Sequence, residues 1–239
     1  MARLLLLPAC LGDTDPALVL PAAYLTRMEH LRAFFVEDMR SARRFLRKIG
    51  YRLPFEDVLF VELNEHTRAS CIEEVLRQQG VDESLLSGQD IGVLSEAGLP
   101  CVADPGAMAV EWAHRKGMQV VPFSGPSSLF LALMASGLNG QSFCFHGYLP
   151  ATPKERVARI RELESASLKR NQTQLFIETP YRSQAMFESL LESCRPSTRL
   201  CVASSITLPD EFIRTMTVGQ WKKSPASIQK KNTVFLLLA

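Results

Sequence analysis

Short apolar runs alternate with longer amphipathic stretches along the first half of the chain. Apolar and β-branched residues gather at 4–7, 33–36, 58–63, 91–94 and 119–123, and each run has the length of a buried strand. Between these runs, apolar residues recur at helical spacing over about 39–49, 67–79 and 104–116. Gly50, Gly80 and Gly117 follow these stretches, and glycine commonly ends a helix. The alternation predicts a mostly parallel sheet with helices on both of its faces.

The same pattern begins again near residue 120. Strands are expected over 120–123, 143–148, 174–177, 200–203, 212–218 and 233–238, and helices over 126–136, 153–168 and 183–194. The strand at 212–218 is expected to be antiparallel, and the strand at 233–238 to lie inside its sheet. We therefore predict an α/β protein of two αβα lobes, residues 1–119 and 120–239, with mostly parallel mixed sheets. The cleft between the two lobes is the expected ligand site.

Two of the predicted strands lead into loops of small residues. The first loop is Glu96-Ala97-Gly98-Leu99-Pro100, and the second is Ser124-Gly125-Pro126-Ser127-Ser128. In an open α/β sheet, ligands bind beyond the carboxyl ends of the strands. Glycine and proline also simply turn a chain, which would be enough to explain one such loop. Two of them on successive strands favour a binding site.

Composition and charge narrow the class of protein. Hydrophobic residues make up 46% of the chain and charged residues 22%, as in soluble globular proteins. No apolar run approaches the ~20 residues of a membrane helix, and the run before Pro8-Ala9-Cys10 is too short for a secretion signal. We therefore expect a cytoplasmic protein without membrane contact.

Cysteine spacing and the distribution of charge add two further expectations. The six cysteines form no C-x-x-C pair and the four histidines are scattered, which predicts free thiols and no metal site. Residues 1–120 carry 13 Lys and Arg against 17 Asp and Glu, whereas residues 121–239 carry 14 against 8. A basic second half is compatible with a polyanionic partner.

The predicted helix over 39–49 separates its apolar and basic residues onto two faces. Ala42, Phe45, Leu46 and Ile49 fall on one face, and the other face carries Arg40, Arg43, Arg44, Arg47 and Lys48. One interpretation is a surface helix with a solvated basic face. The other is a set of phosphate contacts to RNA, because these cations have no interleaved glutamate. Both interpretations stay open at this point.

Several common catalytic motifs are missing. The chain has no nucleophile elbow, no Walker phosphate loop and no H-E-x-x-H, and no G-x-G-x-x-G follows its first strand. This weighs against hydrolases, P-loop nucleotide enzymes, NAD enzymes and the commoner Rossmann-type methyltransferases. The residues by themselves indicate a two-lobed α/β protein that binds a small ligand at loops after strands.

Three long segments and several short ones carry a resemblance to a known family. The long segments are S-E-A-G-L-P-x-x-A-D-P-G from Ser95, V-V-P-F-S-G-P-S-S from Val120, and L-M-A-S-G-L-x-x-x-x-F-x-F-x-G-Y-L-P from Leu133. The short ones are Leu11-Gly12-Asp13, Glu37-Asp38-Met39-Arg40, Asn64-Glu65 and Glu178-Thr179-Pro180-Tyr181-Arg182. Together they resemble the tetrapyrrole-methylase-like superfamily of S-adenosylmethionine-dependent methyltransferases. Within it, they are most similar to the bacterial branch that methylates a ribose 2′-hydroxyl of small-subunit ribosomal RNA.

This resemblance implies a fold, a cofactor and partners. It implies two αβα lobes, a homodimer, RNA (small-subunit ribosomal RNA) as the substrate, and S-adenosylmethionine bound in the cleft between the lobes. Carried over by position, the cofactor would contact three loops and the late strands, at Pro8, Leu11, Gly12, Ser95, Glu96, Ala97, Gly98, Leu99, Ser127, Ser128, Ile177, Glu178 and Thr233.

Methyl transfer to a ribose hydroxyl also requires side chains that align the reacting groups and remove the hydroxyl proton. Alignment of the reacting groups supplies most of the rate. Loss of the hydroxyl proton calls for a carboxylate, or for a cation beside the developing alkoxide. Glu37, Asp38 and Arg40 are the candidate catalytic residues. The alternative for the two carboxylates is a purely structural role at a helix N-terminus.

The chain departs from the ribosomal RNA branch at several positions. Where the branch has A-R-E-L-T-K, this chain has Ala203-Ser204-Ser205-Ile206-Thr207-Leu208, and Glu96 replaces an aspartate. The first hypothesis is an S-adenosylmethionine-dependent methyltransferase of ribosomal RNA. A methyltransferase of a small molecule such as a tetrapyrrole is an alternative, which the basic helix opposes. A non-catalytic RNA- or protein-binding relative is another, which the missing Arg, Glu and Lys favour.

Overall fold

The computed structural model of the chain describes residues 2–64, 67 and 71–239, and it divides into two compact units, Met1–Ser127 and Ser128–Ala239. Glu65 of the Asn64-Glu65 match lies outside the described residues, as do residues 68–70 of the helix expected over 67–79.

The first unit is built on a five-stranded parallel sheet. Its strands are β1 (Arg3–Leu7), β2 (Ala33–Val36), β3 (Leu59–Glu62), β4 (Ile91–Leu94) and β5 (Gln119–Pro122), in the order β3-β2-β4-β1-β5. Its helices are α1 (Tyr24–Met28), α2 (Met39–Lys48), α3 (Ile72–Gln78) and α4 (Ala107–Arg115), with short 3₁₀ turns at Pro16–Leu18, Phe55–Asp57 and Glu83–Leu86. All four strand pairings are parallel, so the carboxyl ends of all five strands lie at one edge.

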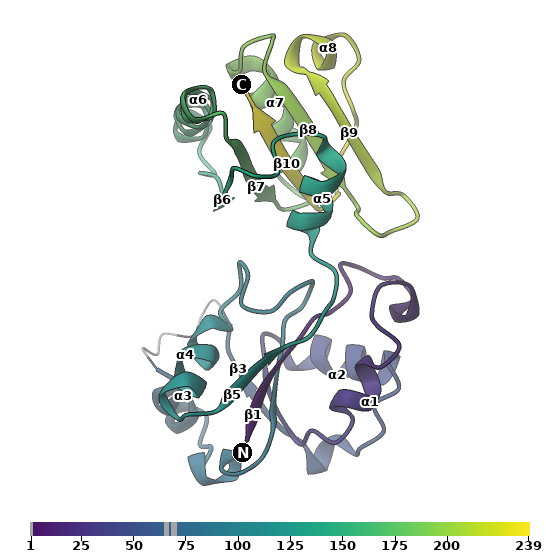
Figure 1. Ribbon diagram of the computed structural model, residues 1–239, viewed down its shortest axis with the longest axis vertical. Helices are drawn as coiled ribbons and strands as arrows, with labels where there is room; N and C mark the ends of the chain where they lie inside the picture. The colour runs from purple at the N-terminus through teal and green to yellow at the C-terminus, as the bar shows by residue number, and fades with distance from the viewer. Residues whose placement is uncertain (1, 65–66, 68–70) are drawn as a thin grey trace. The chain divides into compact units, whose positions relative to one another are not determined.

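Each face of this sheet has its own hydrophobic core. Leu5 and Leu7 of β1 point toward α1 and α2, where they join the buried Tyr24 and Leu46. Leu4, one residue away, joins the opposite core with residues of α3 and α4, as the alternation of side chains along a strand requires. Figure 1 shows α3 and α4 on one side of the strands and α1 and α2 on the other.

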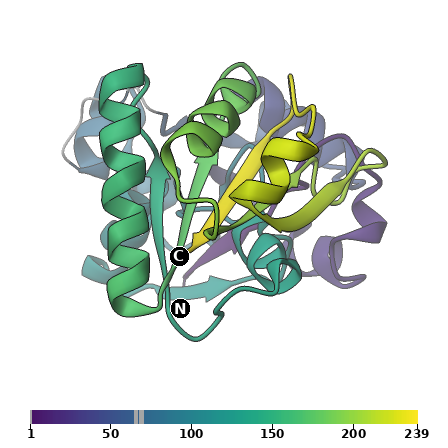
Figure 2. The ribbon, with the colours of Figure 1, turned by 90° about the horizontal axis from the view of Figure 1, so that it is seen from above.

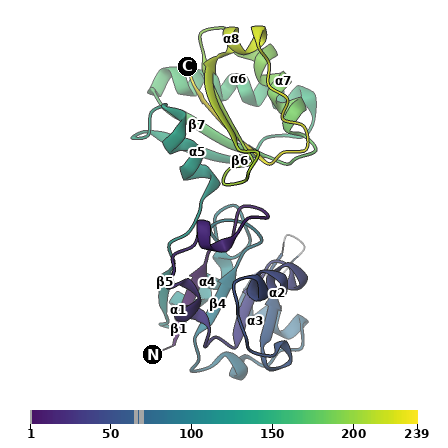
Figure 3. The same ribbon diagram turned by 90° about the vertical axis from the view of Figure 1, so that its right-hand side faces the viewer.

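The second unit contains a mixed sheet. Its strands are β6 (Phe143–Tyr148), β7 (Thr173–Glu178), β8 (Arg199–Ser204), β9 (Phe212–Thr217) and β10 (Thr233–Leu238), in the order β6-β7-β10-β8-β9. β6 pairs with β7 in parallel (Figure 3). The other three pairings are antiparallel, because β10 runs back between β7 and β8 and β9 folds back on β8.

Helices pack against this second sheet as well. They are α5 (Ser128–Ser136), α6 (Pro153–Arg170), α7 (Ser183–Ser193) and α8 (Val218–Lys223). The buried side chains of α6, α7 and α8 form one core with Phe176 and Phe235 of the sheet. The 18-residue helix α6 is seen beside the strands in Figure 2. α5 lies against β9 and β10, and its buried Ala132 and Leu133 are not part of that core.

The prediction of an α/β fold with two sheets is confirmed, and all ten expected strands are present. The antiparallel strand at 212–217 and the internal position of β10 are also confirmed. The second sheet contains more antiparallel pairing than expected. Two short helices, α1 and α8, were not expected. Among the described residues, no helix is long and apolar enough to cross a membrane.

The division between the units falls later than residue 119. β5 forms parallel pairs with β1, so the strand expected to open the second half completes the first sheet. The first compact unit therefore extends to Ser127.

Candidate functional site

Three loops come together at the carboxyl edge of the first sheet. They follow β4, β1 and β5, which are neighbours in that order. Leu7 pairs with Leu94, and Leu6 pairs with Pro122. Parallel strands in this register end side by side, so the loops that follow them start side by side as well.

The loops after β1 and β4 are joined by backbone hydrogen bonds. The Ala9 N–H donates to the Gly98 carbonyl at 2.9 Å, and the Gly98 N–H donates to the Ala9 carbonyl at 3.2 Å. Gly98 has a φ of +74°, and a Cβ at this position would lie 3.1 Å from the Leu11 side chain. Glycine is the residue that suits both the left-handed backbone and this close contact.

The loop after β5 packs directly on the loop after β1. A Cβ on Gly125 would lie 2.3 Å from Cβ of Pro8 and 2.6 Å from its Cγ, which is closer than real carbon atoms approach. Ser127, two residues later, is buried. The structure thus brings together Pro8, Leu11, Gly98 and Ser127, four of the predicted cofactor contacts.

Two side chains, those of Tyr24 and Ser95, donate hydrogen bonds to backbone carbonyls of these loops. The buried Tyr24 hydroxyl donates to the Pro8 carbonyl at 2.7 Å, and burial raises the pKa of Tyr24, so the hydroxyl keeps its proton. The Ser95 hydroxyl donates to the Gly98 carbonyl at 3.3 Å. Gly12, Glu96 and Ala97, in contrast, are exposed at this edge. The Glu96 carboxylate is therefore available to a ligand, whereas the Gly12 carbonyl already accepts a hydrogen bond from the Thr14 N–H at 3.0 Å.

The two candidate carboxylates after β2 occupy different environments. Glu37 Oε2 accepts a hydrogen bond from the Glu96 N–H at 3.3 Å, which places it beside the loop after β4. Asp38 caps α2 and accepts from the Ser41 N–H at 2.7 Å. Its hydrogen bonds with Ser41 lower the pKa of Asp38, and a lower pKa makes a weaker base. Asp38 thus has the capping role set out as the structural alternative, whereas Glu37 lies beside the loop after β4.

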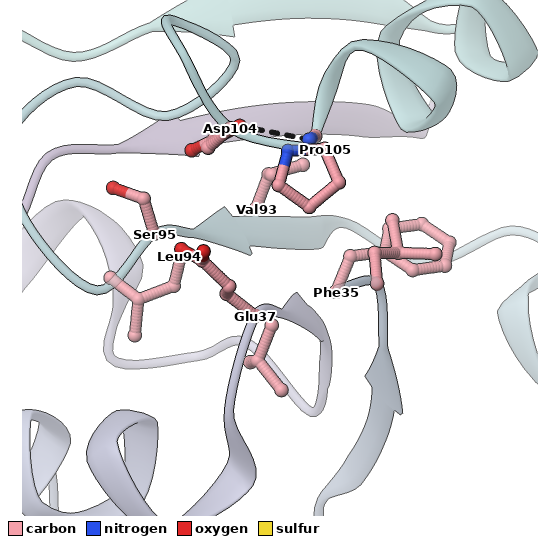
Figure 4. Close-up of a pocket in the computed structure, with 10 residues that line it drawn as sticks. Phe35, Glu37, Val93, Leu94, Ser95, Asp104 and Pro105 are labelled. Carbon is pink, nitrogen blue, oxygen red and sulfur yellow. Dashed lines mark hydrogen bonds between the residues drawn. The ribbon is translucent and has the colours of Figure 1, made fainter. Parts of the chain in front are cut away.

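A small pocket opens between the ends of β2 and β4 (Figure 4). Glu37, Ser95 and Asp104 bring polar groups to it, together with apolar side chains from both strands. Its volume is about 10 Å³, on the order of one water molecule. The pocket has room for a water-sized group rather than for a nucleoside, so a larger ligand at this edge would lie over the exposed parts of the loops.

Asp104 is a residue at this pocket that the sequence did not single out. It accepts hydrogen bonds from the Cys101 N–H at 2.7 Å and the Gly106 N–H at 2.8 Å. Burial raises the pKa of Asp104, although both hydrogen bonds oppose this effect. Cys101 and Ala103 have φ values of 67° and 61°, a conformation that non-glycine residues rarely adopt. The signal for this turn is the A-D-P-G sequence, which belongs to the segment that carries the family resemblance and which also predicts the start of a helix; neither use gives Asp104 a role of its own.

The remaining predicted contacts lie in the second unit. Ile177 and Glu178 end β7, and Glu178 pairs in register with Thr233 of β10. The Glu178 side chain is 0% exposed, and its Oε1 accepts from Arg182 Nη2 at 2.8 Å and from the Thr179 N–H at 2.8 Å. Its Oε2 is buried without a hydrogen-bond partner among the described residues. Ser128 is the first residue of α5.

Thr233 takes part in a small hydrogen-bond network. Its hydroxyl lies 2.9 Å from the Ser204 hydroxyl and donates to the Lys231 carbonyl at 3.0 Å. In the part of the chain that the structure describes, no group of three or more His, Cys, Asp or Glu side chains gathers as a metal site would require.

Comparison with known proteins gives consistent matches. A sequence model of the family described as Tetrapyrrole (Corrin/Porphyrin) Methylases matches residues 21–222. The chain is 32% identical to a Vibrio cholerae protein named Ribosomal RNA small subunit methyltransferase I over 165 residues, which are 68% of this chain and 56% of that protein. A Pasteurella multocida protein of the same name is 32% identical over 216 residues, or 89% of this chain and 72% of that protein. The chain thus spans little more than half the length of the Vibrio relative.

Two solved structures share the fold. The methyltransferase CobJ superposes with a TM-score of 0.58 at 16% identity, covering 100% of this chain and 94% of the other. A uroporphyrin-III C-methyltransferase from Thermus thermophilus, complexed with S-adenyl homocysteine, gives a TM-score of 0.54 at 17% identity and covers 99% of this chain and 97% of the other. Both likenesses concern the fold alone.

Proposed function

Because the chain belongs to the tetrapyrrole methylase family, we propose that it is an S-adenosylmethionine-dependent methyltransferase that acts on ribosomal RNA. The observation that carries the proposal is the convergence of the loops after β1, β4 and β5, at which Gly98 bonds to Ala9 and Gly125 packs on Pro8. Ligands of open α/β sheets bind at this edge. The relatives named for ribosomal RNA methylation support the acceptor.

The residues at this edge fit the cofactor by their chemistry. Exposed backbone groups at Gly12 and Ala97 can hydrogen-bond a flat heterocycle or a carboxylate. The exposed Glu96 carboxylate can accept from ribose hydroxyls or from an ammonium group. When bound, S-adenosylmethionine supplies a methyl carbon attached to a positively charged sulfur. The protein's part is to bind and orient, since alignment provides most of the rate in such a transfer.

Glu37 is the residue we propose to take the proton from the acceptor hydroxyl. It is half-buried, lines the pocket and lies beside the loop after β4. Arg40 begins the exposed side of α2 one turn later and would favour an alkoxide by its charge. Asp38 is less suited, since capping α2 already engages its carboxylate.

A tetrapyrrole acceptor is the second candidate. The family description, Tetrapyrrole (Corrin/Porphyrin) Methylases, points to it, whereas the two solved structures, at 16% and 17% identity, support the fold alone. The relatives at 32% identity are named for ribosomal RNA, which favours the RNA acceptor.

We also propose a cytoplasmic homodimer. Phe130 and Met134 on α5 are 56% and 77% exposed, and Tyr148 at the end of β6 is 54% exposed. β6 is also an edge strand. Exposed apolar side chains next to an unpaired strand edge are typical of an interface, and a second copy of the chain is the proposed occupant. Analytical ultracentrifugation across micromolar concentrations tests this, and a monomer throughout would contradict it.

The test of function begins with calorimetric titration of S-adenosylmethionine and of its demethylated product. We expect saturable binding of both at one site per chain. Transfer of a labelled methyl group to small ribosomal subunits, and in parallel to a uroporphyrin-type tetrapyrrole, then identifies the acceptor. Glu37→Gln should keep cofactor binding and lose at least about 100-fold in transfer rate, the usual contribution of a general base. Binding of neither compound would overturn the proposal.

A further inference from the structure

The five cations of α2 fall into two groups according to what they contact. Arg43 lies with its guanidinium 5.1 Å from the centre of the Phe60 ring, and Arg47 lies 4.0 Å from that of Phe55. Arg47 also donates to the Tyr51 carbonyl at 2.8 Å. Both arginines therefore form cation–π contacts with aromatic rings, and the backbone hydrogen bond holds Arg47 in addition.

The second group forms a stripe along the outer side of the helix. Arg40, Arg44 and Lys48 are spaced four residues apart and are all exposed, whereas Ala42 and Leu46 are buried on the inner side. With a rise of 1.5 Å per residue, successive members of the stripe lie about 6 Å apart along the helix axis.

The stripe is only partly neutralised. Lys48 forms an ion pair with Asp13 at 2.5 Å, and the Asp13 side chain is 100% exposed. Within residues 2–64, 67 and 71–239, neither Arg40 nor Arg44 forms a salt bridge, although the charges of both act on Asp38 and that of Arg44 also acts on Asp13. An exposed pair such as Lys48–Asp13 is weak because water and salt screen it, so a competing anion can displace Asp13.

The stripe starts at the edge where the three loops converge. α2 begins directly after Glu37 and Asp38, and Glu37 bonds to the N–H of Glu96 in the loop after β4. Arg40 is in the first turn of the helix, so a polyanion lying along Arg40, Arg44 and Lys48 has one end beside Glu37. Figure 3 shows α2 at one side of the first unit.

We infer that Arg40, Arg44 and Lys48 bind successive phosphates of the RNA acceptor and lead its backbone to the loop edge. The inference rests on the proposed function, because it takes RNA as the acceptor. The planar guanidinium groups of Arg40 and Arg44 can each bind a phosphate through two hydrogen bonds. The helix holds all three charges in a fixed order, which positions a strand without reading its sequence.

The test compares two pairs of exposed cations on helices. Arg40→Ala/Arg44→Ala removes two members of the stripe, and Arg44→Ala alone removes one. The matched control is Lys154→Ala/Arg161→Ala, which removes two exposed cations from α6. Alanine favours the helix in each case, and circular dichroism checks that the fold is kept. Binding of a fluorescent fragment of small-subunit ribosomal RNA is measured by anisotropy at several salt concentrations, with cofactor titrated separately.

The expected result is a weaker salt dependence that follows the number of stripe residues removed. Each lost phosphate contact lowers the slope of log K against log salt by about 0.7 for a single strand, so the double variant should lose about 1.4. Its affinity for RNA at low salt should fall at least tenfold, while the α6 control keeps the wild-type slope. Arg44→Ala should lose about half as much slope as the double variant and keep its affinity for S-adenosylmethionine.

Other outcomes would contradict either the role of the stripe in RNA binding or the choice of RNA as the acceptor. If the wild type binds RNA and the double variant keeps its slope, or if the α6 control loses as much, the stripe is not the RNA surface and the proposed function stands. If the wild type binds S-adenosylmethionine but not RNA, the RNA acceptor is wrong and the inference falls with it. Stripe-dependent binding to anionic lipid vesicles instead of RNA would assign the stripe to a membrane surface.

Discussion

Gly125 and Pro8 lie so close that a Cβ on Gly125 would be 2.3 Å from Cβ of Pro8. This contact packs the loop after β5 on the loop after β1. Gly125→Ala must push these loops apart, and overpacking of this kind costs about 1 to 3 kcal/mol of unfolding free energy. Because the proposed site uses both loops, we expect the affinity for S-adenosylmethionine to fall at least tenfold, as measured by calorimetry.

The matched control for this change is Gly140→Ala. A Cβ on Gly140 would meet nothing within 4 Å, and Gly140 has no left-handed backbone. Its unfolding free energy should stay within about 0.5 kcal/mol of the wild type. Unchanged cofactor affinity in a folded Gly125→Ala protein would mean that these two loops do not form the cofactor site.

Tyr24 offers a second, gentler perturbation of the same loop. Tyr24→Phe removes the hydrogen bond to the Pro8 carbonyl and keeps the ring that packs on Phe123. A buried carbonyl left without its donor costs about 1 to 3 kcal/mol, which chemical denaturation will measure. The affinity for S-adenosylmethionine should fall as well. An unchanged affinity together with lowered stability would limit Tyr24 to a structural role.

The fold was largely predictable because its signals are local. Each strand is a short apolar run, and Gly50 and Gly117 mark helix ends that follow from their conformational freedom alone. The short helices α1 and α8 were not predicted, because Tyr24–Met28 and Val218–Lys223 are only five and six residues long. Segments of this length show too little helical periodicity. The antiparallel direction of most strands in the second sheet was not predicted either, because the apolar content of a strand does not say which neighbour it will pair with.

The candidate site was predictable only in part. The glycine-rich loops were predicted because they follow two successive strands, and the carboxylates after β2 because they match a motif of the family and suit the removal of a proton. Asp104 could not, because its approach to the pocket depends on the left-handed Cys101 and Ala103. The division of the α2 cations into two groups could not be predicted from the sequence. Arg43 and Arg47 contact Phe60 and Phe55, which lie on later segments of the chain.

The pH dependence of stability should reflect Asp90, which lies just before β4. Burial alone would raise the pKa of Asp90, but hydrogen bonds from Arg3 and His30 outweigh this effect and lower the pKa to about 2. An unfolded aspartate has a pKa of about 3.9, so the ionised group stabilises the fold above about pH 4. That contribution is lost as the pH falls through about 2.

Asp90→Asn should therefore lower the unfolding free energy at pH 7 by about 1 kcal/mol, the scale of a partly exposed ion pair. It should also flatten the decline in stability between pH 4 and pH 2, followed by urea denaturation at each pH. The exposed Asp57→Asn, in the same unit, serves as the control and should keep the wild-type pH profile. An equally steep decline in Asp90→Asn would assign the acid sensitivity to other carboxylates.

Glu178 provides the test of the predicted contacts in the second unit. Its Oε1 is occupied by the Thr179 N–H and by Arg182, whereas its buried Oε2 has no partner among the described residues. A buried oxygen left in this way is costly unless a ligand supplies a donor. Glu178→Gln keeps the shape but can replace that acceptor with an amide N–H. If Glu178 contacts the cofactor, the affinity for S-adenosylmethionine should fall at least tenfold, or about 1.4 kcal/mol.

The exposed Glu192→Gln on α7 makes the same chemical change away from this position and should leave both affinity and stability unchanged. Denaturation of Glu178→Gln separates the two roles of Glu178, because weakening its ion pair with Arg182 lowers stability whether or not a ligand binds. Reduced stability with wild-type affinity for S-adenosylmethionine would show that the carboxylate serves the fold of β7 and the start of α7. Loss of affinity in a protein that stays folded would place Glu178 among the residues that contact the cofactor.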